Sequence, residues 1–183
     1  GNALTRVQRD DYYLASKFTY RSSNAERKII SPKDLRRRLH QTLRCLKVEC
    51  LDLYQIHGLQ LEDVDSVMND LVPELERQRQ AGKIRFIGFT GHKDPRIHQK
   101  MLNKGFEWAT AQMPINVMDY FYRSFQRDVL PLCLSGDVGV LGMKSLGGGV
   151  TQAKIPLDTT LTAEQCVRYA LSQPISTLVR GYT

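Results

Sequence analysis

The chain has 183 residues, of which 42% are hydrophobic and 25% are charged, a balance typical of a soluble globular protein. No run of about 18 apolar residues occurs, so we expect no transmembrane helix, and no signal-peptide pattern is present. The length fits one large domain or two small ones. A net charge of +7 keeps a surface for nucleic acid or an anionic ligand under consideration.

Strand patterns alternate with helical patterns along the whole chain. In chain order, strands are predicted at 12–18, 50–56, 83–91, 107–113, 138–144 and 175–179. Helices are predicted at 31–46, 62–79, 94–105, 123–136 and 162–173. Strict alternation of this kind predicts parallel strands joined by crossover helices.

Local signals set several helix ends. Ser31 is a good N-cap and Pro32 suits the first helical turn. Gly82 can take the left-handed conformation that ends a helix. Pro73 and Pro131 fall inside helical patterns, where each should break or kink the helix.

Two architectures fit the alternation, an open doubly wound sheet and an eight-stranded β/α barrel. An open sheet normally carries a glycine-rich phosphate loop after its first strand, and none follows residues 12–18. The glycine-rich stretch at 145–149 lies near the end instead, where barrels often bind phosphate. The sequence therefore favours a single (β/α)8 barrel domain over residues 1–183, with about six of the eight β/α units present.

Two other features have simple structural explanations. Leucines recur at helical spacing around Arg36, Arg37 and Arg38, which predicts that these arginines occupy the solvated side of a helix rather than a phosphate-binding face. The four cysteines form no C-x-x-C pair, so we expect unpaired thiols, most of them buried, rather than a zinc site. Unpaired thiols suggest a reducing compartment, and we expect a cytoplasmic location.

Two ionisable residues end neighbouring strands. Lys17 lies at the end of the first predicted strand and His57 follows the second. In parallel β/α proteins functional groups gather at the carboxyl ends of strands, and the alternation of side chains places Tyr13, Ala15 and Lys17 on one face, as it does Gln55 and His57. A solvated rim lysine and a structural histidine are the alternatives. Asp52 has the opposite parity to His57 and is expected to face the helices.

The ordered segments "YYLASKF", "LRCLKVECLDLYQIH", "QAGKIRFIGFTGH", "ATAQMPIN" and "GVLGMKSLGGG" resemble the aldo/keto reductase family, most of all bacterial members of uncharacterised substrate. The resemblance covers nearly the whole chain. It implies a β/α barrel that binds NADPH and reduces a small aldehyde or ketone by hydride transfer. By the same resemblance, Lys17 would tune a catalytic tyrosine and His57 would orient the substrate carbonyl.

The resemblance also implies a set of cofactor-binding residues. Those expected around the nicotinamide and its carboxamide are Thr90, Gly91, His92, Gln112 and Met143. Thr90 to His92 match the family only in part, and Met143 replaces a common tyrosine that stacks on the ring, a role that a thioether can also fill. Those expected around the pyrophosphate are Lys144, Ser145, Leu146, Gly147 and Gly148.

The catalytic tyrosine and aspartate of the family precede the lysine strand, so we expect both to lie outside this chain, in a longer protein. The segment that holds the adenosine phosphate is also missing, which leaves NADP(H) expected and NAD(H) not excluded. A catalytically weak nicotinamide-binding regulatory subunit on the same barrel is the alternative function. Nucleic-acid binding is a third, weaker hypothesis, and we expect neither nucleic acid nor membrane as a partner.

Overall fold

The computed structural model describes residues 2, 6–23, 27–148 and 155–179, apart from the side chains of residues 157 and 158. The chain divides into two compact units, Gly1–Thr90 and Gly91–Thr183. Each unit holds three parallel strands in chain order, β1-β2-β3 in the first and β4-β5-β6 in the second. The predicted alternation of parallel strands and helices is thus confirmed. The expectation that the chain acts as one domain remains a prediction.

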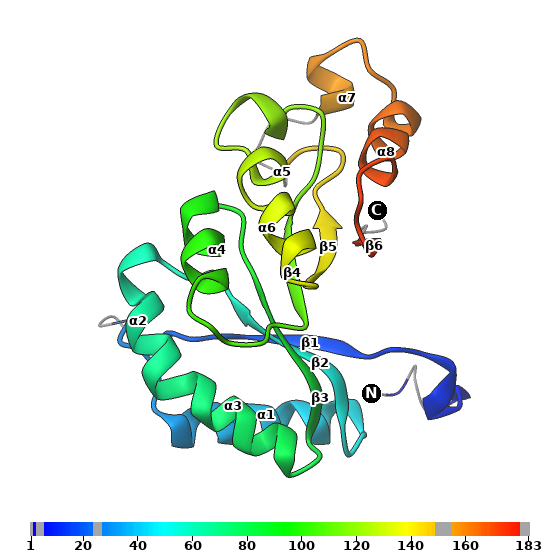
Figure 1. Ribbon diagram of the computed structural model, residues 1–183. Helices are drawn as coiled ribbons and strands as arrows, with labels where there is room; N and C mark the ends of the chain where they lie inside the picture. Colours follow the sequence, from blue (N-terminus) through cyan, green and yellow to red (C-terminus); the bar gives the residue numbers. More distant parts are fainter. Residues whose placement is uncertain (1, 3–5, 24–26, 149–154, 180–183) are drawn as a thin grey trace. The chain divides into compact units, whose positions relative to one another are not determined.

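In the first unit the helices pack on one face of the strands (Figure 1). The elements, in chain order, are η2 (Arg9–Asp11), β1 (Ala15–Thr19), α1 (Pro32–Leu46), β2 (Leu51–His57), η3 (Leu61–Asp63), α2 (Val64–Ser66), the π-helical turn η4 (Val67–Leu71), α3 (Val72–Gln80) and β3 (Ile84–Thr90). β2 is the central strand, and Leu51 to Ile56 are all buried. A strand buried on both faces reads as a continuous apolar run, which is the pattern that the sequence showed.

The second unit repeats the β/α pattern with shorter helices. Its elements are α4 (Pro95–Leu102), β4 (Thr110–Pro114), η5 (Asp119–Phe121), α5 (Phe125–Asp128), α6 (Leu130–Ser135), β5 (Gly139–Met143), α7 (Ile155–Asp158), α8 (Ala163–Leu171) and β6 (Thr177–Val179). Among the described residues, no helix is long and apolar enough to cross a bilayer.

Helix caps and breaks follow the local signals. The Ser31 hydroxyl accepts a hydrogen bond from the Asp34 N–H at 3.1 Å, and Gly82 has a φ of +70°. Pro73 lies in the first turn of α3, directly after the π-helical turn η4, so the predicted helix 62–79 runs without a gap from Val64 to Gln80 but changes to π-helical geometry just before the proline. Pro131 likewise lies in the first turn of α6, which separates it from α5.

The predicted bounds of two strands were wrong. β1 begins at Ala15 rather than Tyr12, because the Leu14 N–H donates to the Asp52 carboxylate at 2.7 Å instead of joining the ladder. β4 runs from Thr110 to Pro114 rather than 107–113, because the chain at Trp108 makes a tight turn and buries its indole. A side-chain contact with Asp52 set the first bound and a backbone turn at Trp108 set the second.

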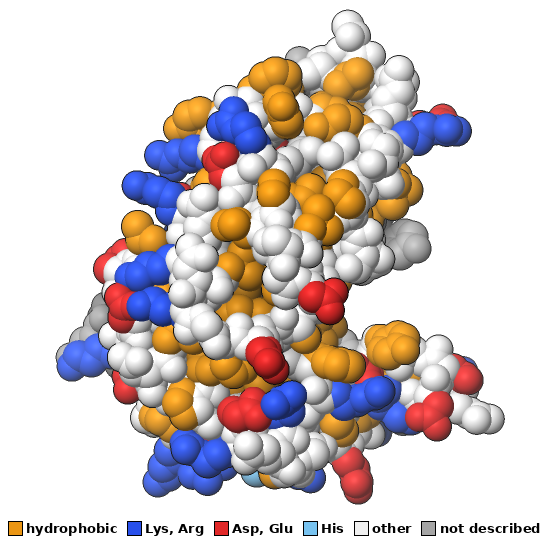
Figure 2. Space-filling view, in the orientation of Figure 1, with side chains coloured by type: hydrophobic (Ala, Val, Ile, Leu, Met, Phe, Trp, Pro, Cys, Tyr) orange, Lys and Arg blue, Asp and Glu red, His pale blue; other side chains and the backbone are white. Residues whose placement is uncertain are grey.

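The arginines of α1 and the cysteines agree in part with expectation. Leu35, Leu39 and Leu43 are buried, while Arg36 and Arg37 are exposed, and a group of Lys and Arg side chains lies over this end of the first unit (Figure 2). Arg38 instead donates to the Thr19 carbonyl at 2.6 Å. All four cysteines are thiols, but only Cys133 and Cys166 are buried; the expectation that most are buried was wrong for the other two.

Candidate functional site

Lys17 and His57 come from neighbouring strands of the first unit. Lys17 pairs in register with Gln55, and Thr19 with His57, so Lys17 and His57 are diagonal neighbours on one face. His57 ends β2 as expected, whereas Lys17 is the middle residue of β1, two residues before the end of that strand. The shared face agrees with the predicted alternation of side chains. Side chains this close in register can act on one bound group.

The environment of His57 keeps its ring neutral near pH 7. The side chain is half-buried, and burial, followed by the charge of Lys17, lowers the pKa of the imidazole. A neutral imidazole can donate one hydrogen bond to an oxygen without carrying a charge itself. Among the charged groups near His57, Lys17 is the one that acts on its pKa.

The chain just beyond His57 is held by a buried cluster that the sequence did not reveal. Tyr20 is 1% exposed, and its hydroxyl donates to Asp63 at 2.5 Å and accepts from the Gln60 N–H at 3.1 Å. Arg21 also donates to Asp63, at 2.9 Å from Nε. Burial, with the hydrogen bond to Asp63, raises the pKa of Tyr20 to about 12, so the phenol keeps its proton. This cluster joins the loop after β1 to the loop after β2.

Thr90 completes the predicted residues of the first unit. It pairs in register with His57, is 4% exposed, and its carbonyl accepts from the Gly58 N–H at 2.9 Å. Gly58 has a φ of +71°, a conformation that favours glycine and lets the chain turn directly after His57. Lys17, His57 and Thr90 therefore lie on three consecutive strands, β1, β2 and β3.

In the second unit, Gly91, Gln112 and a buried histidine form one assembly. The Gly91 N–H donates to the Gln112 carbonyl at 3.2 Å, and His98 Nε2 contacts the same carbonyl oxygen at 3.1 Å. A Cβ on Gly91 would lie 3.1 Å from the His98 ring, so a side chain there would press on it. Burial lowers the pKa of His98 to about 4. The helical spacing of His98 with Met101 placed it on the apolar face of α4, a signal that could have identified it.

Gln112 and Met143 lie together on adjacent strands. The side-chain amide of Gln112 is 3.6 Å from the sulfur of Met143, and Gln112 is 7% exposed. These two predicted cofactor residues thus share one side of β4 and β5. His92, two residues after the end of β3, is exposed.

The loop after β5 contains the predicted pyrophosphate residues. Lys144 has a φ of +57°, and burial lowers the pKa of its ammonium group. Ser145 is 3% exposed, the Gly147 N–H donates to the Lys144 carbonyl at 2.9 Å, and Leu146 and Gly148 are half-buried. The Asn116 amide donates to the Lys144 carbonyl at 3.2 Å. Asn116 was not predicted to be a site residue, although it is the last residue of the segment "ATAQMPIN" that carries the resemblance.

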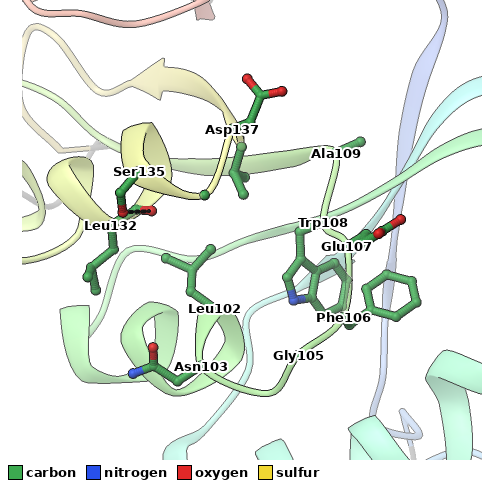
Figure 3. A pocket seen from close by; sticks show the side chains of 12 residues that line it. Leu102, Asn103, Gly105, Phe106, Glu107, Trp108, Ala109, Leu132, Ser135 and Asp137 are labelled. Carbon is green, nitrogen blue, oxygen red and sulfur yellow. Dashed lines mark hydrogen bonds between the residues drawn. The ribbon is translucent and has the colours of Figure 1, made fainter.

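A hollow of about 680 Å³ in the second unit does not belong to this set of residues. Its lining includes Trp108 and Ala109 before β4 and Asp137 and Val138 before β5 (Figure 3). These positions lie at the amino ends of the strands, whereas Gln112, Met143 and Lys144 lie at or near the carboxyl ends. In β/α barrels residues at the amino ends contribute to stability rather than to the active site.

The parallel strands, the crossover helices and the position of the candidate residues define a protein of the β/α-barrel class, with about six of eight units present. Residues 1–179 match the model of the "Aldo/keto reductase family". The chain belongs to this family.

Known relatives and solved structures agree. L-galactose dehydrogenase of Arabidopsis thaliana is 24% identical over 164 residues, which cover 85% of this chain and 48% of that protein. The holo form of an aldo-keto reductase from Bacillus halodurans is 20% identical with a TM-score of 0.75, covering 100% of this chain and 65% of that one. An aldo/keto reductase from Klebsiella pneumoniae in complex with NADP and acetate is 24% identical with a TM-score of 0.60, covering 79% and 46%. The chain spans about half the length of the curated relatives it matches.

Proposed function

We propose that this chain is part of an NAD(P)H-dependent oxidoreductase that reduces an aldehyde or ketone to an alcohol by hydride transfer. Family membership supports an oxidoreductase. The observation that carries the proposal is the pairing of a neutral, half-buried His57 with Lys17 on neighbouring strands. Four thiols without a disulfide fit a reducing compartment, and we place the protein in the cytoplasm.

In this proposal the first unit handles the carbonyl group. The neutral ring of His57 donates a hydrogen bond to the carbonyl oxygen and holds it in place. Lys17 stabilises the phenolate form of a tyrosine outside this chain, which favours release of its proton to the same oxygen. A positively charged histidine would be a poorer partner for Lys17, because two like charges would lie close together.

The second unit supplies residues suited to a nicotinamide cofactor. The side-chain amide of Gln112, which lies 3.6 Å from the thioether sulfur of Met143, suits a carboxamide, and Thr90 at the end of β3, Gly91 and His92 are proposed to bind the same group. Met143 offers a polarizable sulfur to the ring. The half-buried Lys144 with Ser145, Leu146, Gly147 and Gly148 suits the pyrophosphate. When bound, the cofactor supplies the hydride, and NADP(H) is our choice because the Klebsiella relative is described with NADP.

The test is a His57→Ala variant of the full-length protein. We expect kcat for carbonyl reduction to fall by about 100-fold, a size typical of losing one positioned hydrogen-bond donor at a developing oxyanion, while the Kd for NADPH stays within about twofold. His40→Ala, on α1 and away from the strand ends, serves as the matched control and should leave both values unchanged. Unaltered turnover in His57→Ala would remove its assigned role.

The wild-type protein also separates this proposal from the regulatory alternative. Tight NADPH binding without carbonyl reduction over a broad set of aldehydes and ketones would identify a cofactor-binding regulatory subunit. Turnover of any of these carbonyl compounds at an ordinary enzymatic rate, about 1 per second or faster, would exclude it.

A further inference from the structure

His98 is a buried histidine whose ring is bonded to the backbone of a candidate cofactor residue. The side chain is 2% exposed, and its Nε2 lies 3.1 Å from the Gln112 carbonyl oxygen. A carbonyl oxygen only accepts hydrogen bonds, so Nε2 must carry a proton. Burial lowers the pKa of the ring to about 4, so the ring is neutral near pH 7. His98 is therefore an uncharged donor with one defined tautomer.

Packing fixes the orientation of the His98 ring. Its plane makes an angle of 85° with the Phe125 ring of α5, and the ring centres are 5.0 Å apart. Aromatic pairs favour this edge-to-face arrangement. A Cβ on Gly91 would lie 3.1 Å from the ring carbon Cε1, so the missing side chain at residue 91 makes room for the ring. The imidazole is thus confined by packing as well as by its hydrogen bond.

The Gln112 carbonyl oxygen joins three parts of the second unit. It accepts from the Gly91 N–H at 3.2 Å and from the His98 ring at 3.1 Å. Gly91 directly follows β3, His98 lies in the middle of α4, and Gln112 is the middle residue of β4. A shift of the His98 ring would therefore be transmitted to the backbone of β4 at Gln112.

The side-chain amide of Gln112 depends on this backbone for its position. Its nitrogen lies 3.6 Å from the sulfur of Met143, and a thioether is a weak acceptor, so this contact holds the amide only weakly. The place of the amide is then set by the strand from which it projects. His98 holds that strand at the residue that carries the amide.

We propose that His98 is a positioning residue for the nicotinamide cofactor: through the Gln112 carbonyl it holds the Gln112 amide where that amide meets the carboxamide. The inference rests on the proposed function and deepens it. Groups that bind a ligand keep a productive geometry only when the residues behind them lock their positions. A displacement of about 1 Å at such a contact can cost up to about 100-fold. His98 acts from behind the strand and does not itself contact the cofactor.

The experiment measures two dissociation constants of the full-length protein by calorimetry. One ligand is NADPH, and the other is 2′-phospho-ADP-ribose, which lacks the nicotinamide. His98→Leu keeps much of the volume of the ring but removes its N–H. We expect the Kd for NADPH to rise about tenfold, as for the loss of one contributing hydrogen bond, while the Kd for 2′-phospho-ADP-ribose stays within about twofold. His98→Gln, whose side-chain N–H can reach the same oxygen, should recover most of the NADPH affinity.

Trp108→Phe is the matched control, because it also removes a buried ring N–H from a backbone carbonyl of the second unit. The indole donates to the Met101 carbonyl at 3.1 Å, and Trp108 lies before the start of β4. This variant should change neither Kd. Equal rises for both ligands in His98→Leu, an unchanged Kd for NADPH, or no recovery in His98→Gln would overturn the inference.

A variant of Gln112 separates this inference from the proposed function. Gln112→Ala should weaken NADPH binding, and adding His98→Leu should cause little further loss, because the amide that the ring positions is gone. If Gln112→Ala binds NADPH as tightly as the wild type, the proposed carboxamide contact fails and the role of His98 falls with it. If Gln112→Ala weakens binding but His98→Leu does not, the role of His98 alone fails.

A measurement on the wild type covers the case in which His98→Leu does not fold. In protein labelled with ¹⁵N-histidine, the Nε2 resonance of His98, assigned from its loss in His98→Gln, should move when NADPH binds and stay in place when 2′-phospho-ADP-ribose binds. Equal movement with both ligands, or none with either, would contradict a role of His98 in holding the nicotinamide end.

Discussion

At the scale of single residues, the environment sets what each ionisable group does. His57 and His98 are both kept neutral, but for different reasons. His57 is half-buried beside Lys17 at the carboxyl end of its strand, whereas His98 is 2% exposed and serves as a structural partner of the Gln112 carbonyl. Strand alternation predicted that Lys17 and His57 share a face. Nothing in the sequence predicted the carbonyl to which the His98 ring is bound.

Asp52 shows how a side chain of the opposite parity is used. Its carboxylate is 3% exposed and accepts hydrogen bonds from the Leu14 N–H at 2.7 Å, from Arg9 at 2.5 Å and from Arg85 at 2.8 Å. Burial alone would raise its pKa, but the hydrogen bonds outweigh burial and lower the pKa. The Asp52 carboxylate is thus held by a backbone N–H and two arginines, which is a structural role.

We predict that Asp52→Asn lowers the free energy of unfolding by about 2 kcal/mol at pH 7, since one hydrogen-bonded charge is lost while its two arginines remain partly hydrated. The folded-state pKa of Asp52 is depressed, so its contribution is complete above the ordinary pKa of 3.8 and is lost as pH falls below that value. Urea unfolding of both proteins at pH 7 and pH 3 measures the effect. Asp70→Asn, an exposed carboxylate on η4, is the control, and a difference that stays constant between the two pH values would contradict the argument.

At the scale of secondary-structure elements, local chemistry determined where helices begin and break. Proline cannot donate a backbone hydrogen bond, so Pro131 lies in the first turn of α6, and Pro73 lies directly after the π-helical turn η4, in the first turn of α3. The cap residues Ser31 and Thr162 both accept hydrogen bonds from the first helical turn. Strand bounds were less predictable, because a long-range contact between Leu14 and Asp52 moved the start of β1 and a turn at Trp108 moved the start of β4.

We predict that Ser31→Ala costs about 1 kcal/mol of stability, the usual value of an N-cap hydrogen bond. The loss arises because the Asp34 N–H at the start of α1 no longer has its side-chain acceptor. Equilibrium urea unfolding measures it, and Ser31→Thr, which keeps a hydroxyl, should recover most of the stability. Equal losses in the alanine and threonine variants would mean that the cap is not the cause.

At the scale of the whole molecule, buried titrating groups couple stability to pH. His98 has an ordinary pKa of 6.5 and a folded-state pKa of about 4, so the unfolded chain binds an extra proton between these values. The contribution of the neutral His98 ring to the free energy of unfolding is therefore complete above pH 6.5 and is lost as the pH falls toward 4. Asp119, whose pKa burial raises to about 6, acts in the opposite direction over part of the same range.

We predict that acidification from pH 7 to pH 4 lowers the free energy of unfolding of the wild type by about 3 kcal/mol more than that of a His98→Gln variant. The figure follows from about 1.4 kcal/mol per unit of pKa shift. Trp108, the single tryptophan of these 183 residues, lies in the same unit as His98, and its fluorescence follows unfolding of that unit. Asp119→Asn serves as a second variant, because it removes the opposing contribution and should steepen the loss on acidification. Parallel pH profiles for the wild type and His98→Gln would rule out the assignment to His98.

The sequence by itself determined the order of six parallel strands and their helices, the helix caps and breaks, and the family to which the chain belongs. These features depend on side-chain periodicity, backbone conformation and residue order, all of which are local properties of the chain. Only the tertiary structure decided that Tyr20 and Asp63 join the loops after β1 and β2, that His98 binds the Gln112 carbonyl, and that Asn116 links the loop after β4 to Lys144. Each of these contacts joins segments far apart in the chain, and such a contact exists only after packing has brought its partners to hydrogen-bonding distance.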